Sequence, residues 1–426
     1  MFGKSRLDGR VNTKPARMTS TRLAFRVWRL TRLIQNIVFL PVSLILILLL
    51  LLSQKFFPTR IMPMNLSRVG HLGIDVEYAL SEVAHRAPQN RIRLIVVPYR
   101  IDLPVANRTL FKMWRRNTTT FPALVGVPLV WAISRLRLSS HLLYLLPKHI
   151  ANRFNWGSDP YGVTADGVAQ LRFTRNQLED AEERLRQMGL DLSRPFVCLH
   201  VRDDQYHAKH TGGLWTEPHS WRNLPLGNFE KAAELLAAKG FQVVRLGVHT
   251  ASSFSVANEQ EIFDYANNGF RDELLDIFLV SRCSFMISTS SGIDSLAQVF
   301  RRPLYNVGVL APSQLYIHRN VHSIVQRFQR VLDGQILTLS ESLALPKISD
   351  ESMRQLGLQT IVNTADEIAN FAAEASDRAL GLWSPTEEQL KLQLRFIALL
   401  PSEFRRFQIR GGVGSHFLSS HPDWLN

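Results

Sequence analysis

The sequence CSFMISTSSGIDSLAQVFRRPLYNVG, residues Cys283 to Gly308, has the pattern of a strand, a tight turn, a helix and a second strand. An apolar run, Phe285 to Ile287, ends in a series of Ser and Thr residues and then Gly292. Apolar residues at helical spacing follow as far as Phe300, and Pro303 precedes another apolar run. Strands that alternate with helices indicate an α/β fold with a parallel sheet.

The turn in this stretch carries a possible phosphate site. Ser290, Ser291 and Gly292 offer hydroxyl groups and backbone N–H groups at the start of the expected helix. The positive end of a helix binds phosphate without needing a basic side chain. Judged from the turn by itself, ordinary helix capping explains the same residues equally well. We expect the turn to hold a diphosphate, with capping as the alternative.

A second segment, FVCLHVRDD at residues 196–204, places polar side chains at a strand end. Its apolar run is typical of a buried strand in a parallel sheet, and open α/β sheets bind ligands at the carboxyl ends of their strands. His200 and Arg202 are two residues apart and therefore share a face of an extended strand. An arginine there can grip two phosphate oxygens, although a surface ion pair between Arg202 and Asp203 is the simpler alternative.

Four motifs carry a resemblance to a known family: HVRDDQY (200–206), HSWRN (219–223), FDYAN (263–267) and STSSGIDSL (288–296). With them the chain resembles a bacterial family of GT-B glycosyltransferases associated with surface-polysaccharide loci. The resemblance extends to residues 67–80 near the start and 415–425 at the end. The H-x-R motif is also similar to that of fucosyltransferases that use GDP-fucose, in which the arginine contacts the donor diphosphate.

The resemblance implies an α/β, GT-B-like fold with two Rossmann-like domains separated by a cleft, and we expect an N-terminal membrane helix before them. At 426 residues the chain is long enough for two domains. We expect a basic tail at 1–33, a membrane helix or re-entrant anchor at 34–54, a linker at 55–66, an acceptor-side domain at 67–190, a donor-binding domain at 191–335, and a helical tail at 336–426 that packs back on the first domain.

The expected donor site consists of His200, Arg202, Arg222, Asn223, Ser290, Ser291 and Gly292. Arg222 and Asn223 lie in a polar loop, where they would neutralise the leaving diphosphate and bind the sugar or base. A loop in which the arginine packs on Trp221 is the alternative. Asp272, Asp276 and Arg282 are expected to serve helix capping and the helix surface.

Activation of the acceptor hydroxyl requires a base, and the sequence offers several near the strand end. Asp203, Asp204, His207, His210 and His219 are all suitable groups. We favour Asp203 because a strand end holds it rigidly, although the neighbouring arginine would lower the pKa of its carboxyl and weaken it as a base. His207 and His210 have no third ligand at convincing spacing, so no metal and no cofactor other than the nucleotide-sugar donor is expected.

The basic charge of the chain is concentrated at its beginning. The net charge is +14, and residues 1–60 hold eleven Lys and Arg and one acidic residue, which accounts for +10. A charge confined to a tail argues against a nucleic-acid footprint. The two cysteines, Cys198 and Cys283, fall in expected strands and are interpreted as reduced, buried thiols.

The tail precedes 22 uncharged residues between Arg32 and Lys55, enough to span a bilayer. We expect residues 34–54 and the basic tail to bind membrane lipid, with Pro41 able to break the helix into a re-entrant wedge. The alternative is a single span that places the rest of the chain in a lumen. We favour the bacterial inner membrane with a cytoplasmic catalytic portion, because bacterial nucleotide sugars are cytosolic.

These features predict a membrane-associated glycosyltransferase that moves a sugar from a nucleotide-sugar to a lipid-linked or polysaccharide acceptor. A non-catalytic, membrane-anchored GT-B-fold component of a polysaccharide assembly complex is the alternative. Another nucleotide-binding enzyme, such as an epimerase, is disfavoured because no G-x-G-x-x-G opens the first strand–helix turn.

Overall fold

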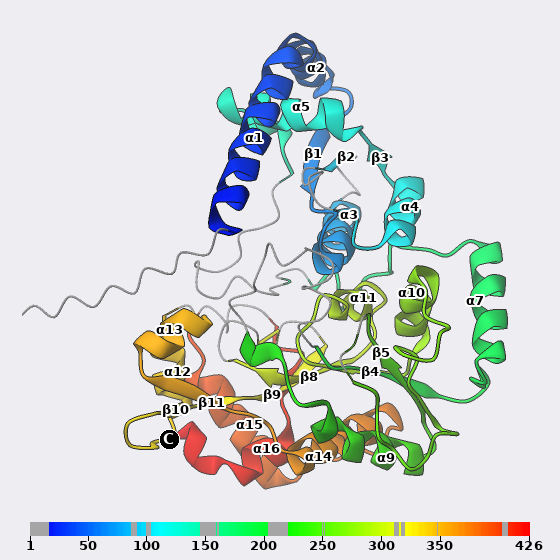
Figure 1. Ribbon diagram of the computed structural model, residues 1–426, viewed down its shortest axis with the longest axis vertical. Helices are drawn as coiled ribbons and strands as arrows, with labels where there is room; N and C mark the ends of the chain where they lie inside the picture. The colour runs from blue at the N-terminus through cyan, green and yellow to red at the C-terminus, as the bar shows by residue number, and fades with distance from the viewer. Residues whose placement is uncertain are drawn as a thin grey trace, which may run out of the picture.

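The computed structural model describes residues 17–86, 92–98, 104–144, 159, 162–202, 220–248, 250, 252–310, 315–316, 320–346, 348–402 and 408–426 (Figure 1). They form a mixed α/β structure with two parallel sheets and a short antiparallel strand pair. Figure 1 shows the larger sheet at one end of the molecule and the first helices at the other. The expected α/β class with parallel sheets is therefore confirmed.

The larger sheet has seven strands in the order β12-β9-β8-β7-β4-β5-β6, all parallel. Its strands are β4 (Phe196–His200), β5 (Gln242–Leu246), β6 (Ile262–Phe263), β7 (Met286–Ser288), β8 (Leu304–Val309), β9 (Val321–Val325) and β12 (Gly412–Val413). Strands β5 and β6 follow on one side of β4, and strands β8, β9 and β12 follow on the opposite side, beyond β7. The switch point of this doubly wound sheet thus lies between β4 and β7, where such sheets bind ligands.

Helices cover both faces of this sheet because most of its strands are buried throughout. One face packs against η3 (Leu226–Phe229), α9 (Glu230–Ala238), α14 (Ala365–Ala379), α15 (Glu387–Leu399), α16 (Ser415–Ser420) and η5 (Pro422–Leu425). The other face packs against α7 (Arg175–Gln187), α10 (Glu273–Arg282) and α11 (Asp294–Val299). A side group holds η2 (Ser220–Arg222), β10 (Arg327–Arg330), β11 (Leu358–Ile361) and α13 (Asp350–Gln355), whereas α12 (Leu339–Ala344) packs with the elements of the α9 face.

The C-terminal segment 336–426 was expected to pack back on the first domain; in the structure it contacts that domain through the ion pair of Arg410 with Asp166 but packs mainly on the larger sheet. Phe371, Phe396 and Trp424 are buried in the core on the α9 face of the larger sheet. The segment also supplies β12, which pairs with β9 and extends the sheet at its edge. The physical reason is that this face and edge would otherwise expose apolar side chains and unpaired backbone groups.

The smaller parallel sheet has the order β1-β2-β3, with β1 at Thr59–Met64, β2 at Arg93–Pro98 and β3 at Thr119–Thr120. Strand β1 occupies half of residues 55–66, the range that was expected to be a linker. Its side chains are largely buried, which a connecting segment would not be. Around the sheet lie η1 (His71–Asp75, a π-helix), α3 (Val76–Arg86), α4 (Arg108–Asn117), α5 (Ala123–Arg135) and α6 (Ser139–Leu142).

One hydrophobic cluster joins the two sheets. Leu72 and Trp114 from the first unit belong to the same buried cluster as Leu275 and Leu296 from the second. Beside this cluster, fully buried Glu77 of α3 forms an ion pair with Arg301, 2.6 Å apart. The two units therefore pack directly against each other. A cleft between them can lie only where this packing is interrupted.

Helices α1 (Arg17–Val38) and α2 (Leu40–Ser53) bend by 59° where they meet, beside Pro41. Within the described part of the chain, no helix alone has the length and hydropathy for a bilayer crossing, whereas this bent pair meets that test jointly. Ile47 of α2 is buried together with Leu129 of α5 and Ile61 of β1. The bent pair is therefore part of the first unit's core.

Candidate functional site

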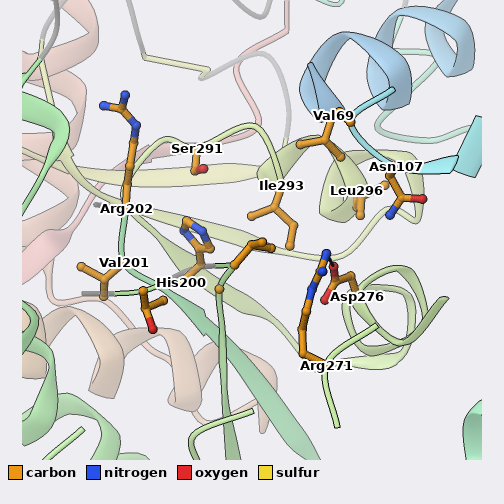
Figure 2. Close-up of a pocket in the computed structure, with 14 residues that line it drawn as sticks. Val69, Asn107, His200, Val201, Arg202, Arg271, Asp276, Ser291, Ile293 and Leu296 are labelled. Atoms are coloured by element: carbon orange, nitrogen blue, oxygen red, sulfur yellow. Dashed lines mark hydrogen bonds and ion pairs between the residues drawn. The ribbon is translucent and has the colours of Figure 1, made fainter. Parts of the chain in front are cut away.

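The carboxyl ends of the central strands open into a cavity at the junction of the two units. It measures about 820 Å³, including the part that is open to solvent. Its lining comes from the segments after β4, β5 and β7, from the β6–α10 loop and α10, and from the first unit, and consists of Val69, Ala106, Asn107, His200, Val201, Arg202, Gly247, Val248, Thr250, Arg271, Asp276, Ser291, Ile293 and Leu296 (Figure 2). This is the switch point that the strand order defines.

The end of β4 places two of the expected residues on this cavity. Arg202 is 6% exposed, and its backbone N–H donates to the hydroxyl of Thr289, 2.9 Å away, so the two strand ends are tied together. Burial and the charges of Arg245 and Arg202 lower the pKa of His200 to about 4, so its imidazole is neutral near pH 7. Figure 2 shows the Arg202 side chain extending away from Arg271 at the far side of the cavity.

The turn after β7 is held by Asp294, a buried carboxylate at the first position of α11. Its carboxyl accepts hydrogen bonds from the Ser288 hydroxyl and from the Ser291 backbone N–H, the latter at 2.9 Å. Burial raises the pKa of Asp294 to about 7 against the opposing effect of these bonds. Capping therefore occupies the N–H of Ser291, one of the backbone groups that the turn was expected to offer to phosphate.

Ser290 has the left-handed backbone conformation, with φ at +54°. L-residues rarely adopt it, and it costs about 1–2 kcal/mol. The guanidinium of Arg222 donates to the Ser290 carbonyl, which helps to hold this conformation. Arg222 therefore reaches the turn that follows β7, 68 residues away in sequence, although it does not belong to the cavity lining.

Arg271 and Asp276 are site residues that the sequence did not reveal. Arg271 lies between β6 and α10, and its guanidinium forms an ion pair with the Asp276 carboxylate at 2.8 Å (Figure 2). Burial raises the pKa of Asp276 to about 6, and Tyr265 donates a hydrogen bond to it. Asp276 was expected on a helix surface but is 6% exposed, whereas Asp272 caps α10 as expected.

Several buried polar atoms near the carboxyl ends of the strands have no hydrogen-bond partner among the residues that the structure describes. They include Nδ1 of His200, Nε of Arg271, Oγ of Ser290, Oδ1 of Asn223 and both amide atoms of Asn306 within β8. Buried polar groups in folded proteins are nearly always paired. Of these residues, His200 and Arg271 line the cavity, so their unpaired atoms suit a polar ligand there.

The expected residues divide into three sets. His200, Arg202 and Ser291 line the cavity, while Ser290, Gly292, Arg222 and Asn223 lie in the adjoining segments. Asp203, the favoured base, lies outside the described residues, as do Asp204, His207, His210 and His219. The catalytic role of Asp203 remains a prediction.

No group of three or more His, Cys, Asp or Glu side chains in the described residues is arranged to hold a metal ion. His207 and His210, the pair considered in the sequence, lie outside them. Cys198 and Cys283 are buried and free, as expected.

No protein-family model matches the sequence, and comparison with curated proteins finds no significant match. Among solved structures, the chain is similar to the ADP-heptose LPS heptosyltransferase II of E. coli, at 15% identity and a TM-score of 0.39 over 70% of this chain and 96% of that one. It is also similar to a family 9 glycosyl transferase of Veillonella parvula, at 10% identity and a TM-score of 0.45 over 76% and 97%. A third is the iron-containing dodecameric glycosyltransferase TibC of enterotoxigenic E. coli, at 15% identity and a TM-score of 0.36 over 76% and 77%. Similarity at this level carries no functional assignment, which must rest on the residues themselves.

Proposed function

We propose that this chain is a glycosyltransferase that takes a sugar from a nucleotide-sugar donor. The observation that supports this most directly is that His200, Arg202, Ser291 and Arg271 line one cavity at the switch point of a doubly wound sheet. The cationic and unpaired N–H groups of this cavity suit the phosphate oxygens of a diphosphate.

In the proposed reaction, an acceptor hydroxyl oxygen bonds to the anomeric carbon of the sugar while the bond to the diphosphate breaks. The nucleoside diphosphate leaves with the electron pair, and the hydroxyl proton goes to a base, for which Asp203 is our candidate. Arg202 and Arg271 would stabilise the charge that develops on the diphosphate. His200, being neutral, would act as a hydrogen-bond partner without adding charge.

The acceptor would be lipid-linked or a polysaccharide, met at a membrane surface. Support comes from the bent pair α1–α2, on which Ile45, Leu48, Leu49 and Leu52 are each more than half exposed. Apolar residues exposed at this density are unusual on a water-soluble surface. With Arg29 and Arg32 on the same bent pair, a shallow insertion into anionic lipid fits this pattern, and we favour the cytoplasmic face of a bacterial inner membrane.

The test is binding and release of nucleoside diphosphates by the full chain in detergent. ADP, GDP, UDP and dTDP should be titrated calorimetrically, followed by release assays with the corresponding sugar donors and a bacterial lipid extract. At least one diphosphate should bind, and Arg202→Ala and Arg271→Ala should each weaken it about tenfold or more, since each removes a charge-assisted contact. Arg354→Ala, at an exposed surface arginine, is the matched control.

Failure of all four diphosphates to bind would overturn the proposal. Donor binding with equal background release by the wild type and Arg202→Ala would instead support the alternative, a non-catalytic component of a polysaccharide assembly complex. A topology reporter fused after Asn426 gives the side of the membrane independently of catalysis.

A further inference from the structure

A second cavity lies on the α14 face of the larger sheet, at the edge formed by β9 and β12. It measures about 600 Å³, including its open part. Its lining comes from β9, the end of α14, the following loop, α15, β12 and the start of α16, and consists of His322, Arg378, Trp383, Pro385, Gln389, Leu390, Gln393, Gly411, Gly412, Val413 and Ser415. None of these residues belongs to the first cavity.

The two cavities lie at different places on the larger sheet. His322 pairs with Tyr305 of β8, and its ring stacks on that tyrosine at 5.5 Å between centroids. Tyr305 in turn contacts Phe371 of α14 edge to face. The imidazole therefore faces the α14 layer, three strands along the sheet from β4, whereas the first cavity lies beyond the strand ends on the side of the first unit.

Three buried polar atoms of this lining have no hydrogen-bond partner in the part of the chain that the structure describes: Nδ1 of His322, Nε1 of Trp383 and Nε2 of Gln393. They come from three separate elements, and buried groups of this kind are normally paired. The indole Nε1 and the amide Nε2 are donors only, so they call for oxygen acceptors. A neutral imidazole nitrogen can donate or accept.

The backbone holds these groups in place. Helix α14 ends at Ala379, Gly381 just after it has a φ of +72°, and the N–H groups of Leu382 and Trp383 both donate to the carbonyl of Asp377. Any side chain at position 412 would put its Cβ 2.6 Å from the Gln393 amide nitrogen, so glycine there leaves room for that amide. The site is therefore formed before any ligand arrives.

The charges in this cavity cancel. Arg378 is paired with buried Glu374 at 2.9 Å, and the other oxygen of that carboxylate accepts from the backbone N–H of Ser415. Burial and the charge of Arg378 lower the pKa of His322 to about 3, so its ring carries no charge near pH 7. A cavity without net charge favours a neutral ligand over an anion.

We propose that this second cavity binds a neutral sugar unit, with hydroxyl groups at His322, Trp383 and Gln393. Sugar hydroxyls donate and accept, which suits two fixed donors and one imidazole nitrogen, and the carbon faces of the ring suit Pro385, Leu390 and Val413. Pockets of this kind combine apolar walls with a few placed polar groups. The inference does not depend on the proposed transferase activity, because it concerns binding at a separate place.

The test uses the full chain in a zwitterionic detergent without a sugar head group. D-glucose, D-galactose, D-mannose, N-acetyl-D-glucosamine and their disaccharides are titrated by saturation-transfer NMR, with no nucleotide-sugar present. We expect saturable binding of at least one sugar with a Kd below about 10 mM. Trp383→Phe and Gln393→Leu should each weaken it about tenfold, because each removes one buried donor.

Gln359→Leu is the matched control, because Gln359 is an exposed glutamine on β11, and it should leave binding unchanged. Gly412→Ala should weaken binding by displacing the Gln393 amide. The proposal is overturned if no sugar in the panel binds saturably, if the cavity variants bind as the wild type does, or if inorganic phosphate or citrate competes for the cavity. Circular dichroism of each variant separates loss of binding from loss of fold.

Discussion

Gly70 and Gly292 lie in backbone contact across the junction of the two units. A Cβ on Gly70 would sit 3.3 Å from Cα of Gly292, and a Cβ on Gly292 would sit 3.3 Å from the backbone nitrogen of Gly70 and 3.0 Å from Val69. Val69 and the neighbours of Gly292, Ser291 and Ile293, line the first cavity. The wall of the cavity therefore depends on two glycines from opposite units.

Gly292→Ala should separate these segments, because backbone atoms cannot yield as a flexible side chain can. We expect a loss of about 1–3 kcal/mol in the free energy of unfolding and weaker diphosphate binding. Gly227→Ala is the control, since a Cβ there meets only the end of the Glu230 side chain at 3.9 Å. Denaturant unfolding and calorimetry measure both effects, and an unperturbed Gly292→Ala variant would contradict the tight contact.

Glu77→Gln should destabilise the chain by about 3–5 kcal/mol, because it leaves the Arg301 charge buried without its partner. Arg301 also donates to the carbonyls of Val163 and Gly167, so the loss spreads to the segment that connects the units. Glu387→Gln, at an exposed ion pair on α15, should leave stability unchanged within error. Equal midpoints for the two variants in urea would refute the prediction.

The Asp294 carboxyl should make stability depend on pH. Its pKa is about 7 in the folded chain and 3.8 in the reference state, so the folded chain holds a proton that the unfolded chain has lost. Between pH 4 and 7 the contribution of this group therefore falls as pH rises, and above pH 7 it is constant.

Asp294→Asn removes this titration, and the difference in unfolding free energy between wild type and variant should decline from pH 4 to 7. Asp276 and His200 titrate in both proteins and cancel in the difference. A difference that is flat across this range would show that Asp294 is ionised throughout.

Ile45→Asp combined with Leu48→Asp should release the chain from vesicles. Both side chains are about 60% exposed on α2, so charge there costs little fold stability but opposes insertion into lipid. Flotation with vesicles of phosphatidylethanolamine and phosphatidylglycerol measures the fraction of the protein that is bound to lipid. Leu332→Asp, at a fully exposed leucine between β10 and α12, is the control and should float as the wild type does.

The sequence allowed the centre of the larger sheet to be predicted well. Runs such as Phe196–Leu199 are uniformly apolar and are easily recognised as buried strands. His200, Arg202 and Ser291 lie at the ends of such runs and therefore meet at the carboxyl edge of the sheet. The start of α15 has a local signal as well, because Thr386 and Gln389 form a capping box.

Other features depend on packing that no local pattern records. Strand β1 contains Pro63 and looked like a linker, yet it pairs with β2 along its whole length. Arg271 enters the cavity because β6 lies beside β5, which spacing along the chain does not reveal. Asp276 had one usable signal, since α10 is apolar on all sides, and a carboxylate in such a helix must be buried with a partner.

One hydrophobic cluster that spans both units limits how this chain can be divided. Because Leu72 and Trp114 pack in the same cluster as Leu275 and Leu296, a cut near residue 190 would expose apolar side chains on both fragments. Neither unit is therefore easily replaced by the corresponding unit of a homologue. Such an exchange would also have to replace the residues of the other unit that pack against it. Heating should accordingly melt the protein in one calorimetric peak.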